Sequence, residues 1–247
     1  MRKEFSAPCL MDISVTKRCN LNCDYCSACA EPGYDSSKEL SLEEFKVIFK
    51  EINDLNVHRI SLAGGEPFVR EDFIDILAEA TKYRFSTIIT NMLMNNEIKL
   101  KFKIVPPNES QVFWLFYFPL KHYGKLELLT LWKQSVNKDI DIRQVSCTAG
   151  VKACSIDENG DIYGCDLMMG MDNLIAGSLR QNSLSEIWNN SALFNKLRKI
   201  NFSDIKGKCS DCECAWCGAG CRSAAYNMSG DLFGSDESCF YNKEVNI

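Results

Sequence analysis

Three cysteines stand close together near the start of the chain, at Cys19, Cys23 and Cys26. Thiolates at such short spacing allow one loop to fold around one soft metal centre. Structural zinc sites prefer cysteines two residues apart, matched by a second such pair, and the gaps of three and then two residues here differ from that pattern. Three ligands leave one iron of a four-iron cluster open for another molecule. The spacing favours an iron–sulfur site, with a zinc loop or a chance cluster as the alternatives.

The same stretch resembles the signature of the radical S-adenosylmethionine (SAM) enzymes, in which an aromatic residue precedes the last cysteine. Tyr25 fills that position. The resemblance implies that Cys19, Cys23 and Cys26 hold a [4Fe–4S] cluster whose open iron binds SAM, with Tyr25 beside the cofactor. Reduction of the cluster would cleave SAM to a deoxyadenosyl radical that abstracts hydrogen.

A second cofactor motif is the run Gly64-Gly-Glu-Pro67. Two glycines after a strand usually form a turn, but they also allow a backbone to approach a ligand closely. A carboxylate such as Glu66 can pair with an ammonium group. In the radical SAM family this motif contacts the methionine amino group, which implies that Gly64, Gly65 and Glu66 bind SAM.

Cysteines also fill the C-terminal part of the chain, from Cys147 to Cys239. Their order, with Gly-x4-Cys followed by Cys-x2-Cys and Cys-x3-Cys, resembles the SPASM domain, the C-terminal extension of many peptide-modifying radical SAM enzymes. The resemblance implies two auxiliary [4Fe–4S] clusters held entirely by cysteine, which suits electron transfer. By motif order the first would take Cys147, Cys154, Cys165 and Cys221, and the second Cys209, Cys212, Cys217 and Cys239.

The auxiliary ligands depart from the family pattern at one point. Four residues separate Cys212 from Cys217, where the family commonly has five, and Cys214 is therefore an alternative ligand. A zinc ribbon is the alternative for this whole half. Cys9, Cys29 and Cys214 are left over from these ligand sets and are interpreted as small buried hydrophobic residues rather than redox groups.

Asp166 directly follows Cys165. In the SPASM enzymes that mature sulfatases, an aspartate at this place is proposed to act as a base. The resemblance makes Asp166 the candidate that helps to remove a proton from the product radical. A hydrogen-bonding residue near the cluster is the alternative role.

Hydrophobic periodicity predicts the elements that position these motifs. Strands are expected at residues 10–15, 58–63 and 86–90, and amphipathic helices at 41–55 and 71–83, the first opened by a capping box. Alternating strands and helices with short links indicate parallel strands in a βα barrel or open sheet. Ligands in such folds bind at the C-terminal strand ends, where both cofactor motifs fall.

The stretch from Met92 to about Val145 is too short for the rest of a barrel, because one βαβ unit takes about 30 residues. Either the barrel is naturally abbreviated or segments are absent from this sequence, and abrupt joins near Asn96 and Ser110 favour the second. Asn91 resembles the family's next SAM-contacting turn, and Leu120 ends a run that resembles the last barrel strand, near the adenine.

The predicted fold class is therefore α/β, with a partial, abbreviated TIM-like radical SAM barrel at residues 1–144 and a small SPASM domain at 145–247. In the second domain, Asn159-Gly160 predicts the turn of a hairpin that brings Cys154 and Cys165 together. A packing helix is expected from about Ser183 through Leu197.

Composition excludes several classes of protein. The chain has 247 residues with 46% hydrophobic and 25% charged residues, as in ordinary globular proteins. A formal charge of −5 argues against a nucleic-acid partner, and no apolar run is long enough to span a membrane. With no signal peptide expected, 14 cysteines and two histidines point to a cytoplasmic protein with thiolate-held clusters.

The resemblance implies three [4Fe–4S] clusters and an external electron donor of the flavodoxin or ferredoxin type. The expected substrate is a side chain of a peptide or protein, above all a ribosomally made precursor peptide. An anaerobic sulfatase maturase and a small-molecule SPASM dehydrogenase are the enzymatic alternatives. A non-catalytic iron–sulfur or zinc protein that binds a partner is the alternative of another class, and such a protein would not bind SAM.

Overall fold

The structure is a computed structural model, and it describes most of both cysteine-bearing segments. The described residues are 5–22, 26, 28–30, 32–57, 59–83, 85, 145–212, 218–237 and 239. The expected strand at 86–90, Asn91, Leu120 and the N-terminal side of the predicted boundary at residue 144 lie outside them. Those expectations stay predictions.

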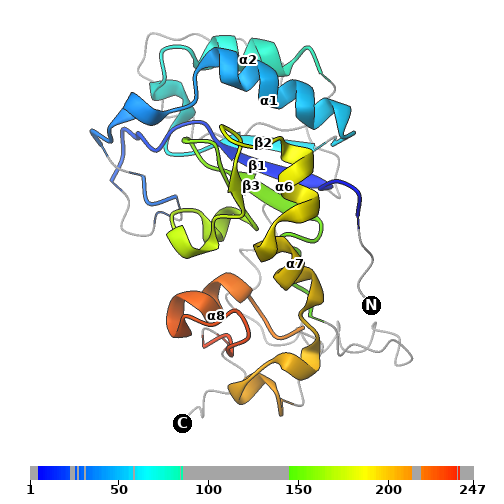
Figure 1. Cartoon of the computed structure of the whole chain (residues 1–247). Coiled ribbons are helices and arrows are strands. Elements are labelled where there is room, and N and C mark those ends of the chain that lie inside the picture. Colours follow the sequence, from blue (N-terminus) through cyan, green and yellow to red (C-terminus); the bar gives the residue numbers. More distant parts are fainter. Residues whose placement is uncertain are drawn as a thin grey trace, which may run out of the picture. The chain divides into compact units, whose positions relative to one another are not determined.

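One sheet organises the described residues, with its strands in the order β2-β1-β3-β4-β5. The strand β1 lies between β2 and β3 and runs parallel to both (Figure 1). The α/β class is confirmed, and the described part holds a partial sheet rather than a closed barrel. The strands are β1 (Leu10–Ser14), β2 (Arg59–Ala63), β3 (Ala153–Ile156), β4 (Asp161–Tyr163) and β5 (Gly177–Ser178).

One helix precedes β2 in the chain and another follows it. The helix α1 (Leu42–Asp54) begins with the expected capping box, in which Ser41 and Glu44 bond reciprocally. Its apolar stripe, including Phe45 and Phe49, is buried. The helix α2 (Phe73–Ala80) is shorter than the expected 71–83 and packs against α1 on one side of the sheet (Figure 1).

The hairpin of the cysteine-rich half joins the sheet of the first half. Its strand β3 pairs with β1 in register, with Met11 opposite Cys154 and Ile13 opposite Ile156. The expected hairpin is confirmed, because β3 and β4 pair antiparallel and Gly160 takes a φ of +88° in the turn. The parallel pairing with β1 was not predicted. It buries every residue of β3, whose short run is apolar enough for a central position.

The helix expected from Ser183 is two helices, α6 (Leu184–Asn190) and α7 (Ala192–Lys199). Ser191 separates them, because its side chain accepts a hydrogen bond from the Phe194 amide and so starts a new helix. Trp188 and Phe194 meet edge to face across this break, with ring centroids 5.4 Å apart. The expected packing role of these residues is confirmed, since both side chains are fully buried.

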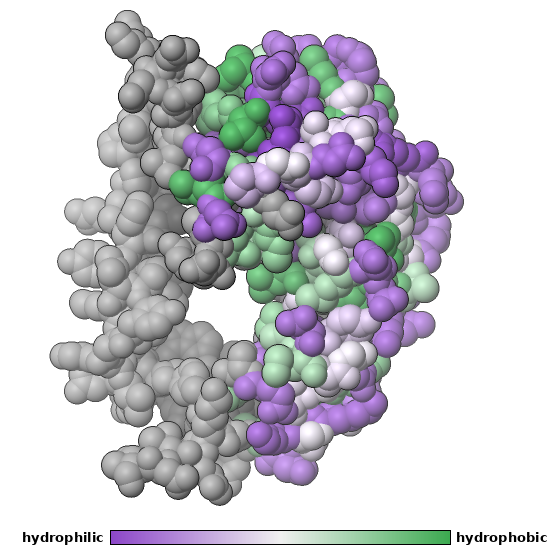
Figure 2. Space-filling model, turned by 90° about the vertical axis from the view of Figure 1, so that its left-hand side faces the viewer, coloured by the Kyte–Doolittle hydropathy of each residue, from purple (hydrophilic) through white to green (hydrophobic). Residues whose placement is uncertain are grey.

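The core is continuous through the described residues and includes side chains from both halves of the chain. Large hydrophobic residues that remain exposed are scattered, for example Val47 on α1 and Met228 on α8 (Arg222–Ser229). On the face drawn in Figure 2, hydrophilic and hydrophobic side chains are interspersed. None of the helices in the described segments has the length and apolar character needed to cross a membrane.

Candidate functional site

The segment of residues 15–18, called here the lead segment, follows β1 and ends at Cys19. It lies against the turn of residues 64–66, called here the glycine turn, which follows β2. The Gly65 amide donates to the Thr16 carbonyl at 2.8 Å, and the Glu66 amide donates to the Arg18 carbonyl at 2.9 Å. The two predicted cofactor motifs therefore meet at one edge of the sheet, as parallel strands require.

Both glycines of this turn are required by the closeness of the lead segment. A Cβ atom at Gly64 would lie 2.2 Å from the Thr16 carbonyl oxygen, and one at Gly65 would lie 2.1 Å from the Arg18 oxygen. Gly64 also has a φ of +139°, which L side chains rarely adopt. The sequence suggested close approach to a ligand, and the structure adds close approach to the protein's own backbone.

Glu66 is buried at the end of this turn, with 1% of its surface exposed. Its carboxylate accepts a hydrogen bond from the Phe68 amide at 3.1 Å, at the start of a short 3-10 helix, Pro67–Val69. This bond fixes the side chain in place, and a fixed buried carboxylate can receive an ammonium group without reorganising.

The cysteine loop itself is described in part. Cys19 and Cys26 are half-buried, and the Cys19 sulfur accepts from the Leu21 amide at 3.4 Å. Cys23 and Tyr25 lie outside the described residues. Three thiolates on one short loop remain the donor set that suits an iron–sulfur cluster.

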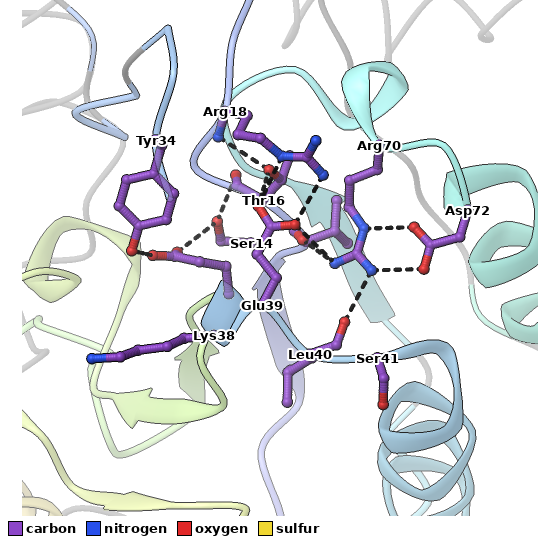
Figure 3. Close-up of polar contacts among 12 residues, drawn as sticks. Ser14, Thr16, Arg18, Tyr34, Lys38, Glu39, Leu40, Ser41, Arg70 and Asp72 are labelled. Carbon is purple, nitrogen blue, oxygen red and sulfur yellow. Dashed lines mark hydrogen bonds and ion pairs between the residues drawn. The ribbon is translucent and has the colours of Figure 1, made fainter. Parts of the chain in front are cut away.

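Against the lead segment lies a group of charged side chains that the sequence did not reveal, of which those of Glu39 and Arg70 are buried (Figure 3). Glu39 accepts hydrogen bonds from the Thr16 hydroxyl at 2.5 Å and from the Arg18 guanidinium at 3.0 Å. Arg70 donates to the Val15 carbonyl at 2.7 Å and pairs with both carboxylate oxygens of Asp72. Burial of charged side chains depends on partners distant in sequence, and no local pattern indicates it.

In the cysteine-rich half, three of the predicted ligands of the first auxiliary cluster lie near one another. Burial raises the pKa of the Cys165 thiol to about 12, and the thiols of Cys147 and Cys221 act in the same direction as neighbouring negative charges. The Ser146 amide donates to the Gly218 carbonyl at 3.1 Å, which holds Cys147 near the chain that leads to Cys221.

Cys154, the fourth predicted ligand, has different neighbours. It is fully buried on β3, and burial followed by the charge of Asp12 raises the pKa of its thiol. The positive charge of Arg198 acts in the opposite direction and lowers the pKa of the Cys154 thiol. Its role as a ligand stays a prediction.

Two predicted ligands of the second auxiliary cluster, Cys209 and Cys239, are held by hydrogen bonds to residues 235 and 236. The Cys209 amide donates to the Ser235 hydroxyl at 3.0 Å, and the Cys239 amide donates to the Asp236 carbonyl at 3.1 Å. The Asp236 carboxylate accepts from the Cys221 amide at 2.8 Å, so these two residues contact predicted ligands of both clusters. Cys212 is half-buried, while Cys214 and Cys217 lie outside the described residues.

Across the segments that the structure describes, no three His, Cys, Asp or Glu side chains are gathered tightly enough to hold one metal ion. The thiols of Cys147 and Cys221 nevertheless lie close enough to Cys165 to raise the pKa of its thiol, and soft thiolates suit iron–sulfur clusters. The donor set therefore fits the expected group in its chemistry.

Asp166 is exposed at the start of a short 3-10 helix, Asp166–Met168. It is close enough to Asp12 on β1 to affect it, since burial and then the Asp166 charge raise the pKa of Asp12. A carboxylate exposed beside a predicted cluster ligand is accessible to a substrate, and its role as a base stays a prediction.

The turn of the β3–β4 hairpin contacts the chain that follows the cysteine loop. Glu158 accepts from the Tyr34 hydroxyl at 2.8 Å, and its carbonyl accepts from the Leu40 amide at 2.8 Å. Beside it, burial raises the pKa of Asp157 to about 6, although the Asp161 amide donates to its carboxylate. The cysteine-rich half thus contacts the segment that follows the cysteine loop through hydrogen bonds, in addition to joining the sheet.

Two family models match the chain, one in each of its two cysteine-bearing halves. Residues 13–105 match the Radical SAM superfamily, and residues 147–213 match SPASM, an iron-sulfur cluster-binding domain. The chain therefore combines a radical SAM domain with a SPASM domain, as its cysteine spacing predicted.

Similar curated proteins match part of the chain. The AdoMet-dependent heme synthase of Methanosarcina barkeri is 35% identical over 95 residues, which are 38% of this chain and 26% of that protein. The PqqA peptide cyclase of Bradyrhizobium diazoefficiens is 31% identical over 91 residues, 36% of this chain and 24% of that protein. The chain thus spans about a quarter of the length of these relatives.

Solved structures extend the similarity of fold to most of the chain. Streptococcus suis SuiB bound to its precursor peptide SuiA has a TM-score of 0.66 and 16% identity, over 95% of this chain and 76% of that one. BtrN in complex with AdoMet and 2-DOIA has a TM-score of 0.53 and 18% identity, over 86% of this chain and 94% of that one.

We predict that Gly65→Ala disrupts the contact between the glycine turn and the lead segment. The new methyl group would displace the Arg18 carbonyl, and the free energy of unfolding should fall by about 3 kcal/mol in urea titrations. Gly170→Ala is the control for open space, because nothing lies within 4 Å of its Cβ position; its φ of +82° adds a backbone strain that Gly65 does not have. The control should cost about 1 kcal/mol, and equal losses in the two variants would contradict the steric argument.

The raised pKa of Asp157 predicts a pH dependence of stability. The folded state holds this proton more tightly than the unfolded chain, so the stabilisation is complete below the ordinary carboxyl pKa and is lost as the pH rises through about 6. Asp157→Asn keeps an oxygen that can accept from the Asn159 and Asp161 amides, and should remove this loss. Urea titrations between about pH 4 and about pH 8 measure it, with a slope of at most about 1.4 kcal/mol per pH unit. A variant with the wild-type slope would show that another group is responsible.

Proposed function

We propose that this protein is a radical SAM enzyme that cleaves SAM reductively and abstracts hydrogen from a side chain of a ribosomally made peptide. The observation that carries the proposal is the contact between the lead segment and the glycine turn. It joins the segment that ends in the three-cysteine loop to the turn that contains Glu66, within hydrogen-bond distance. SAM carries an amino acid group, whose binding in this proposal needs two features at one place. These are an iron with an open coordination position and a carboxylate that pairs with the ammonium group.

In this proposal Cys19, Cys23 and Cys26 hold the SAM-binding cluster. When bound, the cluster and SAM supply a carbon radical that removes hydrogen from the substrate. Glu66 orients the ammonium group of SAM, and Gly64 and Gly65 let the lead segment lie close enough for both contacts. Tyr25, Asn91 and Leu120 are proposed as further SAM contacts by the family resemblance.

The cysteines of the SPASM domain are proposed to hold two auxiliary clusters that take up an electron from the substrate. Together with the first cluster this makes three, supplied with electrons by a flavodoxin or ferredoxin type of donor. The Asp166 carboxylate accepts the proton that leaves the substrate. Its exposure and its place after Cys165 support this role.

A peptide substrate is favoured by two similarities. The fold is similar to that of SuiB bound to a precursor peptide, and 91 residues of the chain are similar to a PqqA peptide cyclase. A small-molecule SPASM dehydrogenase is the second candidate, because the chain covers 94% of BtrN, which was solved with AdoMet and 2-DOIA. Transfer of deuterium from a labelled peptide into 5′-deoxyadenosine would distinguish the two.

We expect about twelve irons and as many sulfides per chain after anaerobic reconstitution, as three four-iron clusters require. The double variant Cys19→Ser/Cys26→Ser should lose about four irons and all SAM cleavage. The matched control is Cys9→Ser/Cys29→Ser, which should behave as the wild type. Both cysteines lie outside the predicted ligand sets, and the expectation that they are buried is wrong, because both are exposed. Stoichiometric zinc with little iron, or SAM cleavage in the Cys19→Ser/Cys26→Ser variant, would contradict the proposal.

Asp166→Asn tests the proposed base. The variant should still cleave SAM, because the carboxylate acts after hydrogen abstraction, but product should form about a hundredfold more slowly. Asp172→Asn is the matched control, since Asp172 is also an exposed aspartate that starts a short 3-10 helix, Asp172–Leu174. Quantifying 5′-deoxyadenosine and modified substrate by mass spectrometry separates the two steps. Equal product from Asp166→Asn and wild type would exclude the role.

A further inference from the structure

The lead segment is held from two sides. On one side the glycine turn bonds the carbonyls of Thr16 and Arg18. On the other side lie side chains from segments that no cofactor motif includes, among them Glu39 and Arg70 (Figure 3). Cofactor binding does not explain this second set, in which the charged side chains of Glu39 and Arg70 are each only 5% exposed.

Glu39 is the centre of this second set. Only 5% of its side-chain surface is exposed, and two guanidinium groups approach its Oε2 atom, Arg18 at 3.0 Å and Arg70 at 3.7 Å. Its Oε1 atom accepts from the Thr16 hydroxyl at 2.5 Å and from Arg18 Nε at 3.2 Å. A carboxylate this deeply buried is stable only with such partners, so its position is determined by them and theirs by it.

Thr16 connects the carboxylate to the backbone of the lead segment. Its side chain is fully buried, and its hydroxyl donates to Glu39 while accepting from the Arg18 amide at 3.0 Å. Because one hydroxyl makes both bonds, it fixes the backbone just before Cys19 in one conformation. A methyl group in its place could make neither bond.

Arg70 holds the start of the same segment. Its guanidinium donates to the Val15 carbonyl at 2.7 Å and to the Leu40 carbonyl at 2.9 Å. Asp72 orients the guanidinium with two bonds, at 2.9 Å and 2.8 Å. The planar fork of arginine makes these contacts together, which a lysine could not. The Arg70 guanidinium therefore links Val15, which follows β1, to Leu40, which precedes α1.

We propose that Thr16, Glu39 and Arg18 are positioning residues, with Arg70, that set the three-cysteine loop at the correct distance from Glu66 for one SAM molecule to reach both. This inference rests on the proposed function and names the residues that hold the lead segment in place for SAM binding. Hydrogen bonds around the residues that hold a metal centre commonly tune its affinity and activity by about 10- to 100-fold.

Thr16→Val and Thr16→Ser form the decisive pair of variants. Valine keeps the volume of threonine and leaves Glu39 with both arginines, whereas serine keeps the hydroxyl. We expect Thr16→Val to bind SAM about 10- to 100-fold more weakly by equilibrium dialysis and to change the electron paramagnetic resonance signal of the reduced SAM-binding cluster. Thr16→Ser should restore both properties, and the signals of the auxiliary clusters should stay as in the wild type.

A second pair keeps the test decisive if Thr16→Val does not fold. Arg18→Lys retains the charge beside Glu39 but loses the paired bonds, and 29% of the Arg18 side chain is exposed, so folding should tolerate it. Arg180→Lys is the matched control at an exposed ion pair, in which Arg180 Nε contacts Glu44 at 2.9 Å. We expect weaker SAM binding in the first and wild-type binding in the second.

The outcomes separate this inference from the proposed function. If the wild type binds SAM and the variants Thr16→Val and Arg18→Lys bind it equally well with an unchanged resonance signal, the positioning role is wrong and the proposed function stands. If the reconstituted wild type itself binds neither iron nor SAM, the proposed function is wrong and this inference falls with it.

Discussion

Backbone hydrogen bonds between the lead segment and the glycine turn are the contact on which the site depends. They join the ends of two neighbouring parallel strands, and at two positions the chains are so close that a Cβ atom would overlap a carbonyl oxygen. Glycine is therefore needed at both positions for reasons of space alone. Backbone groups cannot move without moving the strands, so the sheet holds the lead segment close to the glycine turn, and side chains around the lead segment complete its position.

The strand β1 connects this site to the rest of the molecule. It pairs with β2 on one edge and with β3 of the cysteine-rich half on the other, so two domains of different families share one sheet. The hairpin turn adds contacts to Tyr34 and Leu40, in the chain that follows the cysteine loop. The cysteine-rich half is therefore part of the scaffold of the first site, in addition to holding its own cysteines.

Charge burial supplies the other part of that scaffold. Glu39 and Arg70 each have 5% of their side-chain surface exposed, and they lie within one network with Arg18 and Asp72. Buried ion pairs contribute little net stability because desolvation opposes their attraction, but their geometry is strict. This strictness is suited to a segment that must present Cys19 in one place.

The sequence by itself determined the chemistry and the local elements. Cysteine spacing predicted both family domains, and the capping box at Ser41 with the apolar stripe of α1 predicted that helix, because capping and periodicity act between residues within a few positions of one another. Only the tertiary structure decided that β3 pairs with β1, that Ser191 divides a helix in two, and that the Glu39 and Arg70 side chains are buried against the lead segment. It also separated the surroundings of Cys154 from those of Cys147, Cys165 and Cys221. Each of these depends on residues far apart in the chain. A local sequence pattern does not indicate which distant strand will pair with a strand edge or which distant side chain will pair with a buried charge.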